Sequence, residues 1–173
     1  ANEMVLLAYY IAAVNIEATY HDVAAAEEFT PFGGLVFTDT FQASETADTI
    51  DDTVFTSNTD RGLRQLGLDI QVIVGNPPYS VGQTSMNDAN QNLKYPTLDH
   101  SIETTYAARS AATNKNSLYD SYIRAFRWAT DRIGDSGVIA YVSNGGWIDG
   151  NTTDGMRKTL AEEFDHIYIY NLR

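Results

Sequence analysis

One stretch of the chain restricts its fold more than any other. Residues 70–74 read Ile-Gln-Val-Ile-Val and are followed at once by Gly75 and two prolines. The run has the length and the β-branched composition of a buried strand. Because proline lacks a backbone N–H group and has a fixed φ, the strand cannot continue past this point. The sequence therefore predicts a buried strand that ends abruptly in a turn.

The rest of the chain alternates between strand-like and helix-like patterns. Such alternation, with nearly continuous apolar runs in the strands, favours an α/β fold with a mostly parallel sheet covered by helices on both faces. Residues 43–60 are expected to be a solvated loop with at most one short element, and residues 80–97 a loop. Further strands are expected at residues 35–38, 138–142 and 166–172, and helices at residues 3–19, 98–109, 117–133 and 154–164.

The helix expected at residues 117–133 has the clearest signals. Ser117, with Asp120 three residues later, resembles a capping box, and Gly134 is a suitable C-terminal stop. An apolar stripe runs between them at helical spacing. It consists of Leu118, Tyr122, Phe126, Ala129 and Ile133. The arginines of this helix, Arg124, Arg127 and Arg132, are expected to pair with nearby acidic residues.

Composition excludes several classes of site. The 173 residues include no cysteine, which rules out disulfides and thiolate metal ligands, and no apolar run is long enough to suggest a membrane span. The three histidines do not lie at ligand spacing from carboxylates, so no metal site is predicted. Cytoplasmic location is the default expectation.

The charge balance is strongly acidic. The net charge is −12, with 11 Lys and Arg against 23 Asp and Glu. Binding to nucleic acid relies on basic residues that neutralise phosphates. Either the partner is not a nucleic acid, or the part of the protein that grips it lies outside this chain.

The turn after the central strand, Asn76-Pro77-Pro78-Tyr79, has a chemistry of its own. The Asn76 side-chain oxygen can accept a hydrogen bond from an exocyclic amine, and the prolines leave backbone carbonyls free as further acceptors. Two acceptors on one NH2 group favour its change from planar to tetrahedral as the nitrogen attacks a methyl group. Tyr79 offers an aromatic face on which a flat base or amide can stack. These four residues are the candidate catalytic group.

The segment Val-Ile-Val-Gly-Asn-Pro-Pro-Tyr resembles the catalytic motif of amino-methyltransferases, especially the gamma class of adenine-N6 DNA methyltransferases. Later segments look like further parts of the methyltransferase domain of large single-chain restriction–modification proteins, often associated with a helicase. The resemblance implies a Rossmann-like fold, the cofactor S-adenosylmethionine (SAM) and DNA as the substrate. The later segments are residues 118–124, 137–144, 154–158 and 169–173.

The resemblance also implies which residues bind SAM. Glu3 looks like the acidic residue that binds the ribose hydroxyls of SAM, and Met4 would lie against the adenine. Asp39, within Phe-Thr-Asp-Thr-Phe, looks like the residue that accepts a hydrogen bond from the adenine amine. The family's Gly-rich SAM loop and its target-recognition region have no counterpart in the sequence.

We therefore expect residues 1–173 to be a single, partial methyltransferase domain, truncated at its N-terminus and inactive in isolation. DNA would be bound through parts of the full protein outside this chain. Two other readings stay open. One is methylation of a protein glutamine or of a guanine amine in RNA, and the other is an inactive scaffold domain of a helicase-like protein.

Overall fold

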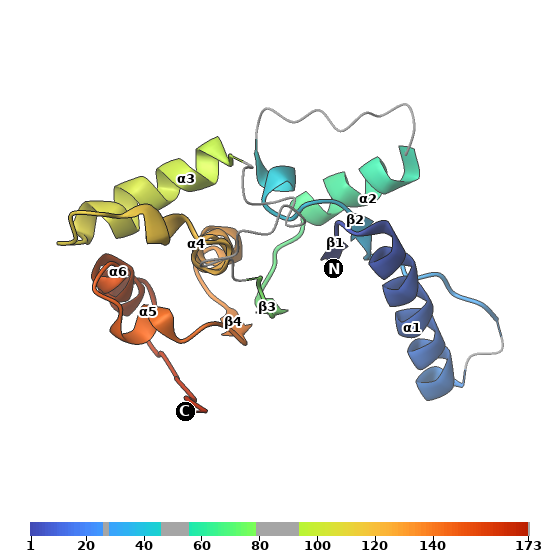
Figure 1. The fold of residues 1–173 in the computed structure, drawn as a ribbon. Helices are drawn as coiled ribbons and strands as arrows, with labels where there is room; N and C mark the ends of the chain where they lie inside the picture. Colours follow the sequence, from blue (N-terminus) through green and yellow to red (C-terminus); the bar gives the residue numbers. More distant parts are fainter. Residues whose placement is uncertain (26–27, 46–55, 79–93, 173) are drawn as a thin grey trace. The chain divides into compact units, whose positions relative to one another are not determined.

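The computed structural model describes residues 1–25, 28–45, 56–78 and 94–172. It divides the chain into two compact units, Ala1–Asp69 and Ile70–Arg173 (Figure 1). We describe each unit by itself.

The first unit contains a short parallel pair of strands and two helices. Strand β1 (Asn2–Glu3) pairs with β2 (Val36–Phe37), and the register places Asn2 opposite Val36. Helix α1 (Leu6–Ala24) connects the two strands, so the unit begins with a strand–helix–strand crossover. A 3₁₀ turn, η1 (Gln42–Ser44), and helix α2 (Thr56–Leu66) follow.

Two predictions for this unit need correction. The helix predicted at residues 3–19 begins only at Leu6, because Asn2 and Glu3 pair with β2 instead. Residues 46–55 of the loop predicted at 43–60 lie outside the described residues, and the prediction is wrong at its end, where α2 begins at Thr56. The buried side chains of α2 are Asn58 and Thr59, which are polar, whereas Leu63 and Leu66 are exposed, so its buried face carries no apolar pattern by which to predict it. The strand predicted at 35–38 is confirmed in a shorter form.

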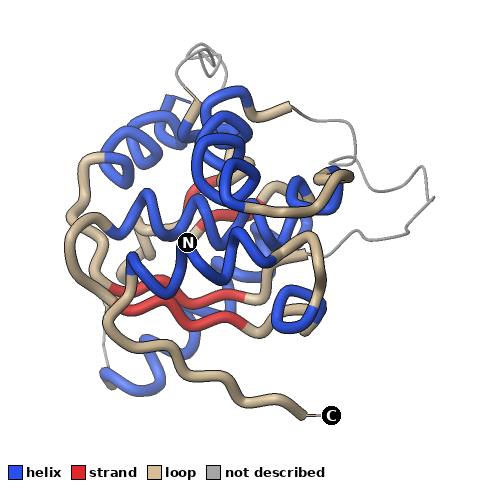
Figure 2. The backbone as a smooth tube through the Cα atoms, turned by 90° about the vertical axis from the view of Figure 1, so that its left-hand side faces the viewer, coloured by secondary structure: helices blue, strands red, loops and turns tan. Residues whose placement is uncertain are grey.

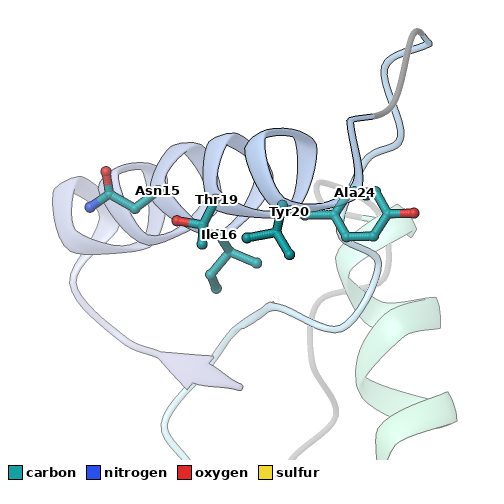
Figure 3. A pocket seen from close by; sticks show the side chains of 6 residues that line it. Asn15, Ile16, Thr19, Tyr20 and Ala24 are labelled. Atoms are coloured by element: carbon teal, nitrogen blue, oxygen red, sulfur yellow. The ribbon is translucent and has the colours of Figure 1, made fainter.

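Helix α1 has apolar residues on all sides, yet none of its side chains is buried. A depression on its second half is lined by side chains of α1 alone, including Ile16, Tyr20 and Val23 (Figure 3). The depression begins at Asn15, roughly 14 Å along the helix from Leu6 at 1.5 Å per residue. It is therefore distant from Glu3 and Met4 and is not the predicted cofactor site.

The second unit is built on another parallel pair, β3 (Val72–Gly75) and β4 (Val138–Tyr141), drawn side by side in Figure 2. All four residues of each strand are paired, from Val72 opposite Val138 to Gly75 opposite Tyr141. The helical elements are α3 (Pro96–Ile102), a π-helical turn η2 (Glu103–Ala107), a 3₁₀ turn η3 (Asn116–Tyr119), α4 (Ser121–Ile133), α5 (Gly146–Asp149) and α6 (Asp154–Glu163).

These helices share one hydrophobic core. Tyr106, Leu118 and Met156 are all fully buried, and Trp147 closes the cluster from α5. The apolar stripe predicted for α4 is confirmed, with Ala129 and Ile133 also buried. Burial of a side chain as large as Leu, Ile or Met stabilises the fold by about 2 kcal/mol. The second unit therefore has a core of its own.

The predicted details of this unit are less accurate than its pattern. Asp120, not Ser117, is the N-cap of α4, and its carboxylate accepts a hydrogen bond from the Tyr122 N–H at 3.3 Å. Helix α3 starts at Pro96, inside the predicted loop 80–97, of which residues 80–93 lie outside the described structure. The strand predicted at 166–172 is wrong: Tyr168 is 90% exposed, and within the described residues no strand pairs with this segment.

Both strand pairs are parallel, as predicted, and the described residues show an α/β fold. The sequence predicts helices on both faces of the sheet, but among the described residues of this unit the cover lies on one face of β3–β4, where α4 packs. On the opposite face Val72, Val74 and Val138 are exposed. Within the described residues no helix is both long enough and apolar enough to cross a membrane.

Candidate functional site

The candidate catalytic turn directly follows β3. Asn76 is exposed, Pro77 is buried, and Pro78 is exposed again. The Gly75 carbonyl accepts a hydrogen bond from the Val142 N–H at 3.0 Å, which ties this strand end to β4. The buried proline thus anchors the turn while the Asn76 amide remains accessible to a ligand. Tyr79 lies outside the described residues, so its stacking role stays a prediction.

An aromatic support lies behind this turn. A Cβ atom at Gly75 would lie 3.1 Å from the Tyr141 ring, so glycine permits close contact between this ring and the strand. The Tyr141 ring meets Phe126 of α4 edge-on, with 5.2 Å between ring centroids. Burial raises the pKa of Tyr141 to about 12, so its hydroxyl stays protonated and donates to the Ala125 carbonyl at 3.4 Å. The turn therefore rests on packed, hydrogen-bonded side chains.

The end of the neighbouring strand β4 is also ordered by a side chain. The Asn144 side-chain oxygen accepts a hydrogen bond from the Gly146 N–H at 2.7 Å, at the start of α5. This places Trp147, 8% exposed, against Phe126. Because β3 and β4 are parallel, Asn76 and Asn144 both follow the carboxyl ends of the pair. Ligands of open α/β sheets bind beyond these carboxyl ends.

The predicted cofactor residues lie together in the first unit. Glu3 is the last residue of β1, and Asp39 follows β2. Because the two strands are parallel, both residues lie at the carboxyl ends of the pair. The Thr38 N–H donates to the Glu3 carbonyl at 3.0 Å, next to Asp39. Met4 is 38% exposed beside them.

Both carboxylates also have a local structural role. Glu3 Oε1 accepts a hydrogen bond from the Val5 N–H at 2.8 Å, at the start of α1. Asp39 Oδ1 accepts from the Phe41 N–H at 2.9 Å and thereby starts η1. These contacts fix the orientation of each carboxylate at the edge of the pair, and their positions suit hydrogen bonds to ribose hydroxyls and to an amine.

A fit to SAM can be judged from this set of residues. Glu3 and Asp39 supply the acceptors that an adenosine group needs, and Met4 supplies an apolar contact. The set thus has the kinds of group that an adenosine would need. Among the described residues no group of three or more His, Cys, Asp or Glu could hold a metal ion.

The candidate residues thus form two groups, one in each compact unit. Glu3, Met4 and Asp39 are brought together in Ala1–Asp69, and the Asn76 turn stands in Ile70–Arg173.

Sequence patterns missed one residue close to the first group. Asn58 of α2 binds the backbone of Phe37, two residues before Asp39. It lies in a stretch predicted to be a loop, and no apolar pattern marks it.

The arginines predicted to form ion pairs include two that do so within the second unit. Arg124 donates two hydrogen bonds to Asp99, at 2.8 and 2.9 Å. Arg127, only 3% exposed, binds Asp131 and Glu163. These guanidinium groups are committed to internal carboxylates.

Three solved structures are similar to this chain over nearly its whole length. A nuclease-deletion mutant of the Type ISP restriction-modification enzyme LlaGI, in complex with a DNA substrate mimic, is 50% identical over 96% of the chain, with a TM-score of 0.89. The ATP-dependent Type ISP restriction-modification enzyme LlaBIII, bound to DNA, is 51% identical over 92%, with a TM-score of 0.85. A DrdV–DNA complex is 41% identical over 95%, with a TM-score of 0.85.

The similarity concerns one segment of much longer proteins. The chain spans 14% of the LlaGI chain, 11% of the LlaBIII chain and 16% of the DrdV chain. At this level of identity, the chain is homologous to a segment of Type ISP restriction-modification enzymes. The sequence matches no family model, and no curated protein is significantly similar to it.

Proposed function

We propose that this chain is the catalytic part of a SAM-dependent methyltransferase that methylates the N6 amine of adenine in DNA, within a restriction-modification protein. The observation that carries the proposal is the position of Asn76. Its accessible amide stands directly after β3, at the carboxyl end of a parallel strand pair, with a buried proline behind it. Homology to a segment of restriction-modification enzymes supports the proposed setting.

Asn76 would act on the amine that receives the methyl group. Its side-chain oxygen accepts one hydrogen bond from the NH2 group, and a backbone carbonyl of the following prolines accepts a second. Two acceptors would stabilise the positive charge that develops on nitrogen as its lone pair forms a bond to the methyl carbon. The bond between this carbon and the SAM sulfur would break, S-adenosylhomocysteine would leave, and the methylated amine would lose a proton. The close packing of Gly75 on Tyr141 supports the strand end from which these acceptors project.

SAM would supply the methyl group, already activated by the sulfonium. Glu3 would accept hydrogen bonds from the ribose hydroxyls, Asp39 one from the adenine amine of the cofactor, and Met4 would contact its ring. Since the methyl group is activated before it is bound, the residues of the chain mainly orient the two reactants.

If DNA is the substrate, the acidic charge of the chain requires that DNA be held mainly by other parts of the full protein. Arg124 and Arg127 bind internal carboxylates, and the chain has a net charge of −12. The phosphate contacts that dominate affinity for DNA would therefore come from other parts of the full protein. An adenine inside a duplex is out of reach, so the base would be turned out of the helix to meet Asn76.

Methyl transfer by the full-length protein tests this function. The protein is incubated with methyl-labelled SAM and, separately, with DNA, an RNA and a glutamine-containing protein. We expect the label on the N6 amine of adenine, identified by mass spectrometry of digested nucleosides. Asn76→Ala should lower the rate by about 100-fold or more, because a preorganised acceptor is lost.

The matched control is Asn151→Ala, which removes an exposed amide outside the proposed site and should leave the rate unchanged. Label on glutamine or on guanine in RNA, with none on DNA, would favour the alternative substrates. Failure of the full-length protein to bind SAM would favour a scaffold role.

A further inference from the structure

On the side of β2 that faces away from β1, the side chain of Asn58 binds the strand backbone. The Val36 N–H donates to the Ala1 carbonyl at 2.9 Å and the Thr38 N–H to the Glu3 carbonyl at 3.0 Å, so the backbone groups of Phe37 between them point to the other side. There the Asn58 oxygen accepts from the Phe37 N–H at 2.8 Å, and the Asn58 amide nitrogen donates to the Phe37 carbonyl at 2.9 Å. One amide thus satisfies both groups, as a neighbouring strand would.

Asn58 is itself held in place. It is 7% exposed, and the Arg61 guanidinium donates to its oxygen at 3.4 Å and to the Tyr9 hydroxyl at 3.0 Å. The Tyr9 ring meets the Phe37 ring edge-on, with 5.7 Å between centroids. Tyr9, Phe37, Asn58 and Arg61 therefore form a closed ring of contacts, which we call the Asn58 clasp. It joins α1, β2 and α2.

The clasp acts on the strand end that carries the predicted cofactor residues. Phe37 lies opposite Glu3 in the pair, and Asp39 follows two residues later. The position of Phe37 in β2 therefore helps to determine how far Asp39 lies from Glu3. A ligand that bridges these two carboxylates requires that distance to be fixed before it binds, because ordering the strand on binding would lower the affinity.

We propose that Asn58, braced by Arg61, is a positioning residue for the adenosine half of SAM. This rests on the proposed function. Asn58 would not contact SAM itself. It would fix β2 so that Asp39 faces the same ligand as Glu3. Its loss should weaken SAM binding while leaving affinity for DNA and the chemical step largely intact.

The test uses the full-length protein and Asn58→Leu, which is close in size and makes neither hydrogen bond. We expect the Kd and the KM for SAM to rise about tenfold, since two buried backbone groups lose their partner. The KM for DNA, and kcat at saturating SAM, should change less than about twofold on the same reasoning, because the Asn76 turn is untouched. Arg64→Gln, on the exposed side of the same helix, should leave the Kd unchanged.

A merely structural role would give a different pattern. Asn58→Leu would then lower the melting temperature and the fraction of protein that binds, while the folded fraction bound SAM with the wild-type Kd. That result, measured by calorimetry together with thermal unfolding, would overturn the proposal.

Asn58→Asp gives a second test if the leucine variant does not fold. The introduced carboxylate still accepts from the Phe37 N–H and from Arg61, but it cannot donate to the Phe37 carbonyl. The Kd relative to wild type should be raised at neutral pH and should approach one as the pH falls and the carboxyl group gains a proton. A ratio that does not change with pH would contradict the proposal.

The outcomes separate this proposal from the proposed function. Wild-type protein that binds SAM and methylates DNA, with clasp variants of unchanged Kd, refutes only the role of Asn58. Wild-type protein that binds no SAM refutes the function itself.

Discussion

Helix α4 buries seven of its 13 residues, whereas α1, with 19, buries none. Around α4, the second unit has a core that includes Tyr106, Leu118 and Met156. Among the described residues of the first unit the buried apolar side chains are Leu35 and Val36, and its elements are joined by polar contacts such as the Asn58 clasp. Burial of apolar area is the main favourable term in folding. The second unit should therefore be much more stable than the first, whose helices should open locally at a lower free-energy cost.

Hydrogen exchange of the 173-residue chain tests this contrast directly. Amides of α4 should exchange only by opening of the whole unit, and those of α1 by local opening. We expect a difference of about 1000-fold in protection, as for an opening free energy that differs by about 4 kcal/mol. Mass spectrometry of peptides from the two helices measures it. Equal protection in both helices would break the comparison.

Gly155 tests how tightly the second unit is packed. A Cβ atom there would overlap the Tyr106 carbonyl oxygen and would lie 2.7 Å from the Ser110 nitrogen. Since both are backbone atoms, Gly155→Ala should destabilise the unit by roughly 3 kcal/mol or more, measured by urea unfolding.

Gly33→Ala in the first unit is the control, because nothing lies within 4 Å of a Cβ atom at that position. Its effect should stay within about 0.5 kcal/mol. A similar loss from both substitutions would mean that packing does not distinguish the units.

Arg127 tests whether polar contacts also matter in the unit with the larger core. It is 3% exposed, lies over the Tyr106 ring and binds Asp131 and Glu163. Arg127→Met should cost about 2 kcal/mol, because both carboxylates lose their partner while remaining partly solvated.

The exposed pair of Arg109 with Glu162 gives the matched comparison. Arg109→Met should cost less than about 1 kcal/mol in the same urea measurement. If the two substitutions cost the same, burial does not govern the strength of these ion pairs.

Asp154 should give the smallest effect, and only in acid. Hydrogen bonds with Ser110, Lys158 and the Ala111 N–H hold the pKa of Asp154 below its ordinary value of 3.8. A lowered folded-state pKa stabilises the fold above pH 3.8, and this contribution disappears as the pH falls below it. Asp154→Asn should therefore flatten the acid limb of the stability profile, whereas Asp135→Asn, at an exposed position, should leave it unchanged. Parallel profiles would refute the role of Asp154.

The sequence predicts the second unit better than the first, and the reason is physical. Leu118, Tyr122 and Ile133 repeat at helical spacing because an apolar core selects them, so the pattern is visible in the sequence. In α2 the inward residues are Asn58 and Thr59, and a polar buried face leaves no such pattern. The strand predicted at 166–172 has the apolar composition of a strand but no partner strand among the described residues, and composition alone cannot supply one.

The sequence marks a candidate site residue directly only where its neighbours in the chain form part of the same motif. The prediction of Asn76 rests on four adjacent residues, Asn76 to Tyr79, whereas Glu3 and Asp39 are predicted only through a resemblance. Asn58 lies 21 residues from Phe37, so its contact exists only once α2 is placed beside β2. A parallel pair of only two residues per strand also gave no local sign that Glu3 and Asp39 would share an edge.

The amide of Asn58 has a consequence for the growth of the sheet. It occupies the backbone groups that Phe37 would otherwise offer to a further strand. No other segment or molecule can add a strand at this position without displacing α2. Strand β2 is therefore closed on that side, so its sheet can extend only beyond β1. A blocked edge also protects the protein from edge-to-edge aggregation, to which unpaired strands are prone.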